Sequence, residues 1–407
     1  MLVDVKISWA KIKEDRNSLA LPILYLLVYG ADALFTPFLS LYYVHCGFSS
    51  VEQAVLLGSL PFALCLGNFL VSIFAKDAKT SFLLLKIVLV GEALASLLFS
   101  LAKPFWLLLI ALILFAFTNS TFFNLNDSFA AIYAKRVHRP FSHYRLFGSL
   151  AYIIVTVITS FFIKEDSYQV LFFVGTSLFF LGFLSSFFLK PIESSIEVTE
   201  EKKSEERKAS FPPRFFLLLL GYTLVFGTFS TLQYVQPIYY ERLNLANSDY
   251  SLWYGIRVAV ELVTLLLLPL LSKKKKLSYS WLVSLSFVLL FLSSLITWLV
   301  PDVMASLIAF SLIRGLGFGF YLGSFVCFIN ALAGDESSSK LLTVVSSASY
   351  AWSGLSCLLS PYLYDTIGFF YTFLIMVILI GVGLILFIAF CFSSKKGKRN
   401  SSNEKGA

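Results

Sequence analysis

Charged residues are scarce in this 407-residue chain, because Asp, Glu, Lys and Arg together make up only 14% of it. Soluble domains carry about 25% charged residues, so an ordinary soluble domain of this length is excluded. The five cysteines show no metal-site or disulfide spacing, and only three histidines are present. Without an HExxH motif or a glycine-rich phosphate loop, the sequence indicates no enzyme, no metal site and no resident cofactor.

Apolar residues are abundant instead, at 58% of the chain with a mean hydropathy of +0.81. Windows of about 20 mostly apolar residues, the length that spans a bilayer as a helix, recur along nearly the whole sequence. We predict an all-α polytopic membrane protein of twelve transmembrane helices. The predicted spans are 19–44, 52–75, 80–101, 104–134, 141–163, 168–190, 214–240, 249–272, 277–299, 302–333, 340–362 and 368–392.

A hydrophilic stretch divides these spans into six plus six. Residues 191–213 are rich in Glu, Lys and Ser, which predicts a solvated cytoplasmic linker between an N-terminal bundle, 1–190, and a C-terminal bundle, 214–392. Residues 393–407 form a basic tail. Lys and Arg concentrate in alternate loops and at both ends, so we expect both termini in the cytoplasm, a cell-membrane location and no nucleic-acid partner.

Two opposite charges lie at matching depth in neighbouring predicted helices. Lys135 and Arg139 mark a basic turn, so Asp127 lies eight residues inside one helix and Arg145 six residues inside the next. At 1.5 Å rise per residue, both lie roughly 10 Å below the membrane surface. Charges buried in this way are costly and are expected to line a polar cavity, where this pair would hold a substrate.

Further ionisable and polar residues inside the membrane follow helical spacing. Four predicted helices each carry a polar stripe on one face. The stripes contain, in chain order, Asp32; Asn124 with Asp127; Arg145 with Ser149 and Tyr152; and Arg257 with Glu261. Arg314 lies in the middle of a further helix. A purely structural reading stays open for some of them. Arg257 and Glu261, four residues apart, could neutralise each other, and Lys86 and Glu92 sit on a third helix expected to be peripheral.

The segment from Asp127 to Tyr152 ends in the run Arg145-Leu-Phe-Gly-Ser-Leu-Ala-Tyr152. This segment resembles the fourth and fifth helices of oligosaccharide:proton symporters. These form the lactose and sucrose permease-like family of the major facilitator superfamily. The resemblance implies two pseudo-symmetric six-helix bundles that work as a monomer. It also implies that Asp127 and Arg145 bind sugar hydroxyls, that Tyr152 stacks on the sugar ring, and that Glu261 serves substrate binding and coupling.

The resemblance has clear departures. Arg314 and Gly317 stand where the family has His and Glu on the tenth helix, and the loop at 75–79 is shortened. The substrate residues therefore carry over better than the proton-coupling residues, for which Glu261 and Asp32 are the candidates, with Arg257 and Arg314 as modulating charges. We expect proton-coupled sugar uptake by alternating access. The alternatives are a symporter for nucleosides or small aromatic acids, a drug exporter of the same fold and, more remotely, a polytopic membrane enzyme.

Overall fold

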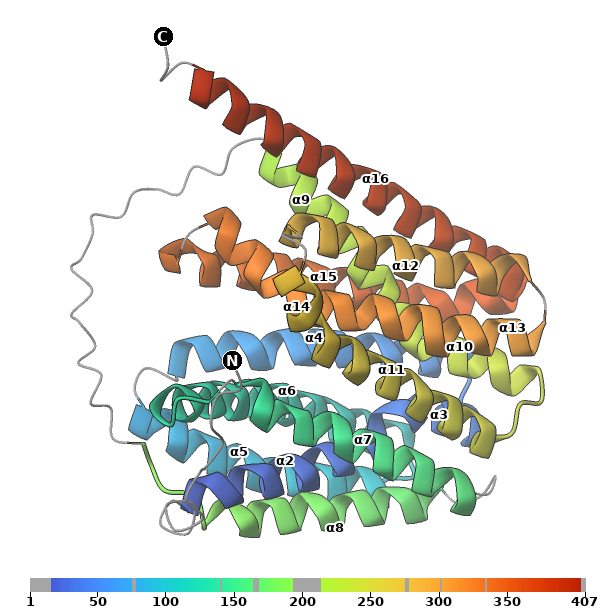
Figure 1. The fold of residues 1–407 in the computed structure, drawn as a ribbon. Helices are drawn as coiled ribbons and strands as arrows, with labels where there is room; N and C mark the ends of the chain where they lie inside the picture. Colours follow the sequence, from blue (N-terminus) through green and yellow to red (C-terminus); the bar gives the residue numbers. More distant parts are fainter. Residues whose placement is uncertain are drawn as a thin grey trace. The chain divides into compact units, whose positions relative to one another are not determined.

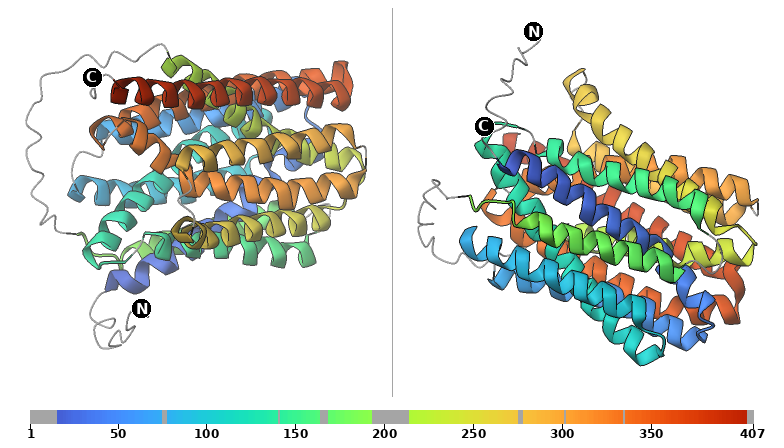
Figure 2. Two further views of the ribbon diagram at one scale, coloured as in Figure 1. Left: turned by 45° about the horizontal axis from the view of Figure 1, so that its top comes forward. Right: turned by 90° about the horizontal axis from the view of Figure 1, so that it is seen from below.

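The computed structural model describes residues 16–74, 78–139, 141–163, 168–192, 214–274, 278–300, 302–333 and 335–403. Within these residues the chain is helical, and twelve helical spans are long and apolar enough to cross a membrane, which confirms the predicted fold class. The first fifteen residues, most of the shortened loop at 75–79 and nearly all of the predicted linker lie outside the described residues. Figure 1 labels the helices and Figure 2 shows them from two further directions.

The helices form two compact units. Unit 1 comprises Met1–Phe38 and Ala63–Glu197, and unit 2 comprises Leu39–Phe62 and Val198–Ala407. A division at the linker alone would place residues 39–62 in the first bundle, whereas their contacts group them with unit 2.

Unit 1 is built around long helices that pack in pairs. Its main elements are α2 (Arg16–Phe35), the second half of α4 (Ser50–Phe74), α5 (Ala78–Leu101), α6 (Phe105–Arg136), α7 (Ser142–Phe162) and α8 (Tyr168–Ser186). Helix α2 packs on α7 and α8, and α5 packs on α6 and α8. The ring of Phe35 stacks on Phe115 and Phe172 at centroid distances of 4.9 and 4.8 Å. A Cβ on Gly175 would lie 2.6 Å from Phe35, so glycine there allows α8 to approach α2.

Unit 2 contains two helices that are interrupted by π-helical turns. The short η1 (Thr36–Phe38) is the last element of the first segment of unit 1. The elements of unit 2 are α3 (Leu39–His45), the first half of α4, α9 (Arg214–Tyr222), η2 (Thr223–Gly227), α10 (Thr228–Arg242), α11 (Asn247–Lys274), α12 (Tyr279–Leu299), α13 (Val303–Ile308), η3 (Ala309–Ile313), α14 (Arg314–Ala333), α15 (Asp335–Thr366) and α16 (Gly368–Asn403). The π-helical turns are η2 and η3. Such turns inside α-helices are frequent at functional sites.

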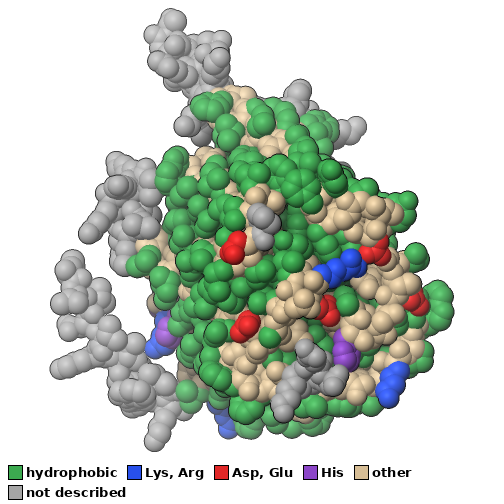
Figure 3. Space-filling model, turned by 90° about the vertical axis from the view of Figure 1, so that its right-hand side faces the viewer, with side chains coloured by type: hydrophobic (Ala, Val, Ile, Leu, Met, Phe, Trp, Pro, Cys, Tyr) green, Lys and Arg blue, Asp and Glu red, His purple; other side chains and the backbone are tan. Residues whose placement is uncertain are grey.

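Many large apolar side chains lie on the outside of these helices. Trp106, Phe161 and Phe162 are each more than 70% exposed. Apolar exterior helix faces of this kind suit contact with lipid rather than water. Figure 3 shows the side at which helices end on the right of Figure 1, where acidic, basic and His side chains lie among the hydrophobic ones.

Candidate functional site

The predicted site residues lie on five helices. In unit 1, α2, α6 and α7 carry Asp32, Asn124, Asp127, Arg145, Ser149 and Tyr152. In unit 2, α11 and α14 carry Arg257, Glu261 and Arg314.

The structure brings Asp127 and Arg145 together as an ion pair in unit 1. Arg145 Nε lies 3.7 Å from Asp127 Oδ2, and their side chains are 34% and 36% exposed. Tyr25 donates a hydrogen bond of 2.6 Å to Asp127 Oδ1, and Tyr29 donates a longer one of 3.5 Å. The guanidinium of Arg145 lies 4.3 Å from the centre of the Tyr29 ring. The pair is therefore oriented by two tyrosines but still reachable, as a binding site for polar ligand groups requires.

Gly148 makes the position of Arg145 possible. A Cβ at residue 148 would lie 2.8 Å from Arg145 Nη1 and 3.0 Å from the Tyr29 ring. Any larger residue would push the guanidinium or the ring away, so the glycine of the Arg145–Tyr152 segment has a steric role that spacing alone did not reveal.

Asn124 and Ser149 lie one turn from the ion pair on the same two helices. The Asn124 side chain donates to the carbonyl of Ser120 at 2.9 Å, and Ser149 is buried. A role for either residue in binding a ligand stays a prediction.

Tyr152 is bound to a second carboxylate rather than to Asp127. Its hydroxyl donates to Asp32 Oδ2. Asp32 Oδ1 accepts two further hydrogen bonds, from Thr36 at 2.8 Å and from Asn119 at 3.0 Å. Asp32 is only 7% exposed, so these three donors replace the water that an ionised carboxylate needs. Tyr152 thus has a polar contact in addition to the stacking face predicted for it.

Glu92 is connected to Asp32 through one amide group. The Nδ2 atom of Asn119 donates to Glu92 Oε1 and Asp32 Oδ1, at 3.0 Å in each case. The two carboxyl oxygens therefore lie no more than about 6 Å apart, where two ionised groups would repel each other by roughly 3 kcal/mol at an effective dielectric constant of about 20. Glu92 is fully buried and also contacts the hydroxyl of Thr118. Sequence reasoning missed Asn119 and Thr118.

Lys86 has its own partners on the same helix and on α8. Its Nζ atom lies 4.7 Å from the ring centre of Phe82 and 5.1 Å from that of Phe187. These cation–π contacts give Lys86 a local structural role.

Arg314 is deeply buried in unit 2 and is held by neutral groups. It is 2% exposed, and it donates to Gln236 Oε1 at 2.7 Å and to the carbonyl of Phe229 at 3.3 Å. Its guanidinium also lies 4.3 Å from the ring centre of Phe229. Gln236, which the sequence analysis did not single out, is the acceptor for this arginine.

Arg257 and Arg314 contact the same aromatic ring. Each guanidinium lies 5.3 Å from the centre of Phe310, which belongs to the π-helical turn η3 just before α14. Arg257 also lies 4.1 Å from the ring centre of Tyr254. Glu261, one turn further along α11, is 8% exposed. The three predicted coupling residues of unit 2 are thus all buried, and the two arginines share one aromatic ring.

A small polar cavity of about 10 Å³ adjoins Arg314 inside unit 2. This volume accommodates about one water molecule. It is far too small for a sugar or a nucleoside. The lining residues come from α10, α12, α14 and α16 and are Leu232, Gln236, Ser293, Ser294, Thr297, Arg314, Phe373 and Val377.

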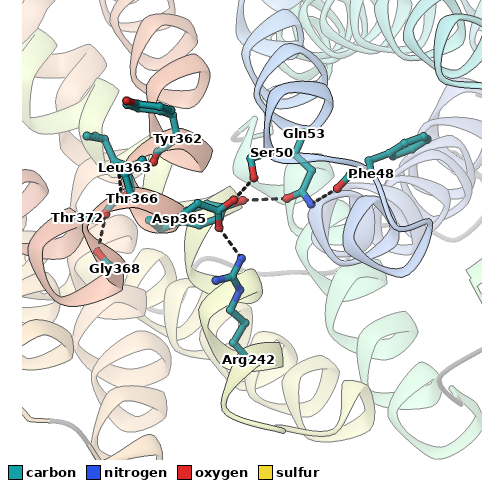
Figure 4. A network of polar contacts seen from close by, with 11 residues as sticks. Phe48, Ser50, Gln53, Arg242, Tyr362, Leu363, Asp365, Thr366, Gly368 and Thr372 are labelled. Atoms are coloured by element: carbon teal, nitrogen blue, oxygen red, sulfur yellow. Dashed lines mark hydrogen bonds and ion pairs between the residues drawn. The ribbon is translucent and has the colours of Figure 1, made fainter.

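A polar network around Asp365 joins three distant segments within unit 2 (Figure 4). Arg242, at the end of α10, donates to Asp365 Oδ1 at 2.8 Å, and Ser50, at the start of α4, bonds to Asp365 Oδ2. Tyr364 donates to Gln53 at 2.8 Å. We call Ser50, Gln53, Arg242, Tyr364 and Asp365 the Asp365 network. It connects the start of α4, which the sequence assigned to the first bundle, to Tyr364 and Asp365 near the end of α15.

The short Ser50–Asp365 contact predicts that these two positions can be cross-linked. The test uses a Cys46→Ser background with Ser50→Cys and Asp365→Cys, and a short bifunctional thiol reagent. After cleavage of the linker at 193–213, the cross-linked protein should migrate in electrophoresis as one species and not as two fragments. The control combines Ser59→Cys with Asp365→Cys, because residue 59 lies about 13 Å further along the same helix. Equal cross-linking of both pairs would contradict the network.

Comparison with solved structures shows the fold of known transporters. The nucleoside transporter NupG is 15% identical, with a TM-score of 0.72, and the alignment covers 92% of this chain and 98% of that chain. A D-xylose–proton symporter is 14% identical, with a TM-score of 0.66 and coverage of 91% and 96%. A bacterial homologue of the human lysosomal transporter Spinster is 14% identical, with a TM-score of 0.68 and coverage of 91% and 95%.

No curated protein matches the sequence. Residues 18–375 match the MFS_1 like family, which is most of the chain. The family and the structurally similar proteins are transporters rather than enzymes. The chain is a multi-pass membrane transporter that belongs to the MFS_1 like family of the major facilitator superfamily.

Proposed function

We propose that this transporter carries a small hydroxylated molecule, first of all a sugar, into the cell together with a proton. The Asp127–Arg145 ion pair carries the proposal, because it is partly exposed and oriented by two tyrosines. A carboxylate accepts hydrogen bonds from adjacent hydroxyls, and a guanidinium offers a fixed fork of donors to hydroxyl or ether oxygens. The sequence of the segment Asp127–Tyr152 resembles that of lactose and sucrose permease-like symporters, and this resemblance supports the same substrate class.

A nucleoside is the second candidate. It offers ribose hydroxyls to the same ion pair and an aromatic base to the tyrosine rings, and the fold is similar to that of the nucleoside transporter NupG. A drug exporter would favour an apolar pocket over a paired acid and arginine, and a small aromatic acid would need a free cation. We place the protein in the cell membrane as a monomer with both termini in the cytoplasm, following the distribution of Lys and Arg.

Counterflow in vesicles separates these substrates. Reconstituted protein, loaded in turn with unlabelled sucrose, lactose, uridine, benzoate or a lipophilic cation, should exchange the labelled form of one class only. We expect accumulation of a labelled sugar or, failing that, of uridine. Counterflow of the lipophilic cation alone would overturn the proposal in favour of an exporter.

Conservative changes in the ion pair should abolish binding. Asp127→Asn removes the acceptor charge, and Arg145→Lys replaces a planar fork with a point charge. Both should lower counterflow at least tenfold with normal amounts of folded protein in the membrane. Arg139→Lys is the matched control, since Arg139 lies in the turn before α7 and contacts His143. Unchanged counterflow in both site variants would remove these residues from the substrate site.

Substitutions at Tyr152 distinguish its ring from its hydroxyl. If the ring packs against the substrate, Tyr152→Phe should keep most of the binding and Tyr152→Ser should lose it. The hydroxyl bound to Asp32 should then matter for proton coupling, so Tyr152→Phe should lower substrate-driven proton uptake more than counterflow. The opposite ranking for binding would make Tyr152 a hydrogen-bond donor to the substrate.

Proton coupling is assigned to Glu261, with Asp32 as the second candidate and Arg257 and Arg314 as modulating charges. Glu261→Gln mimics a permanently protonated carboxyl, so it should prevent accumulation against a gradient while equilibrium exchange continues. Substrate-induced alkalinisation of lightly buffered vesicles measures the coupling directly. Full proton uptake by Glu261→Gln together with its loss in Asp32→Asn would move the role to Asp32, and uptake that survives both changes would refute the scheme.

A further inference from the structure

We infer that Glu92 holds a proton in this conformation and that Asn119 links it to Asp32, so that the bridge Asp32–Asn119–Glu92 is a single buried proton site next to the substrate site. The inference rests on the proposed proton coupling and adds to it a carboxyl group on α5 that the sequence favoured as structural.

The hydrogen bonds around Glu92 provide the first argument. The amide nitrogen of Asn119 donates to Asp32 Oδ1 and to Glu92 Oε1, at 3.0 Å in each case, so it holds the two carboxyl groups close together. The Thr118 hydroxyl donates to Glu92 Oε2, but it also lies 2.9 Å from the carbonyl oxygen of Leu114 and 3.1 Å from that of Phe115. Because a hydroxyl has only one hydrogen to donate, three acceptors compete for it and Glu92 receives only a share.

The charges around Glu92 provide the second argument. Glu92 has no exposed surface, and among the residues that the structure describes it makes no ion pair with a Lys or Arg. The titratable group that shares the Asn119 amide with Glu92 is Asp32, which is also an acid. An ionised carboxylate without a cation is costly in such a place, and two of them sharing one amide group are costlier still. One of the two must carry a proton.

The partners of Asp32 decide which of the two is ionised. Asp32 accepts hydrogen bonds from three donors, Thr36, Asn119 and Tyr152. Hydrogen-bond donors favour the charged form of a carboxyl group. Glu92 has one unambiguous donor, the amide of Asn119. The proton therefore belongs on Glu92.

This arrangement connects proton binding to the substrate site through short steps. Tyr152 donates to Asp32 and lies on α7 two turns after Arg145, the partner of Asp127. A substrate that packs on the Tyr152 ring and draws its hydroxyl away from Asp32 would weaken the support for that negative charge. A proton taken up from the aqueous side would then bind to Asp32, while Glu92 keeps its own proton and Asn119 stays bonded to both groups.

Infrared difference spectroscopy tests the inference without any substrate. Purified full-length protein in lipid nanodiscs at neutral pH should show the C=O stretch of a buried protonated carboxyl group, shifted in D₂O. Glu92→Gln should remove this band, whereas the matched control Glu52→Gln, at a residue near the start of α4 bonded to Ser49, should keep it. Absence of the band in the unaltered protein, its persistence in Glu92→Gln, or its loss when Na⁺ replaces K⁺ would overturn the inference.

A second variant covers the case in which Glu92→Gln does not fold. Thr118→Val has nearly the same shape but cannot donate a hydrogen bond to Glu92 Oε2, so the C=O band should move to higher frequency. An unmoved band would contradict the assignment to Glu92.

The role of Asn119 is tested in vesicles with sucrose and uridine as probes. Asn119→Ser should reduce substrate-driven proton uptake at least fivefold while counterflow is retained. Asn126→Ser, at a fully buried asparagine on the same helix, should leave both unchanged. Full proton uptake in Asn119→Ser would refute the link. If neither probe is transported, the proposed function fails, and the infrared band still decides the protonation of Glu92.

Discussion

The burial of charge among apolar helices is the constraint on which the rest of this structure depends. A charged group that water cannot reach needs donors, acceptors or an opposite charge supplied by the protein. The protein provides such partners in three ways. Asp127 and Arg145 form an ion pair, hydrogen-bond donors surround Asp32, and neutral acceptors and aromatic rings surround Arg314. Each solution fixes the register of the helices that provide the partners.

The two units solve the problem with different chemistry. In unit 1 acids predominate, and hydroxyl and amide donors from α2, α6 and α7 surround them. In unit 2 two arginines share the ring of Phe310 at a π-helical turn. Phe310 and Arg314 lie four residues apart across the end of this turn, and both are buried.

The Asp365 network shows a different use of charge. Arg242 and Asp365 are partly exposed, so their attraction is screened by solvent and contributes little to stability. An ion pair of this kind is readily broken and reformed. It is therefore better suited to a contact that opens during a transport cycle than to one that holds the fold together.

The sequence by itself determined the twelve spans and the Asp127–Arg145 pair, because hydropathy, helical rise and the positions of basic turns act along one chain or between adjacent helices. It also placed Asp32 in a polar stripe on one face of the first helix. Only the tertiary structure decided the partners across non-adjacent helices: Asn119 between Asp32 and Glu92, Gln236 for Arg314, and the attachment of Ser50 to Asp365. These contacts depend on the rotation and depth of helices far apart in the sequence, which close packing sets and local periodicity does not.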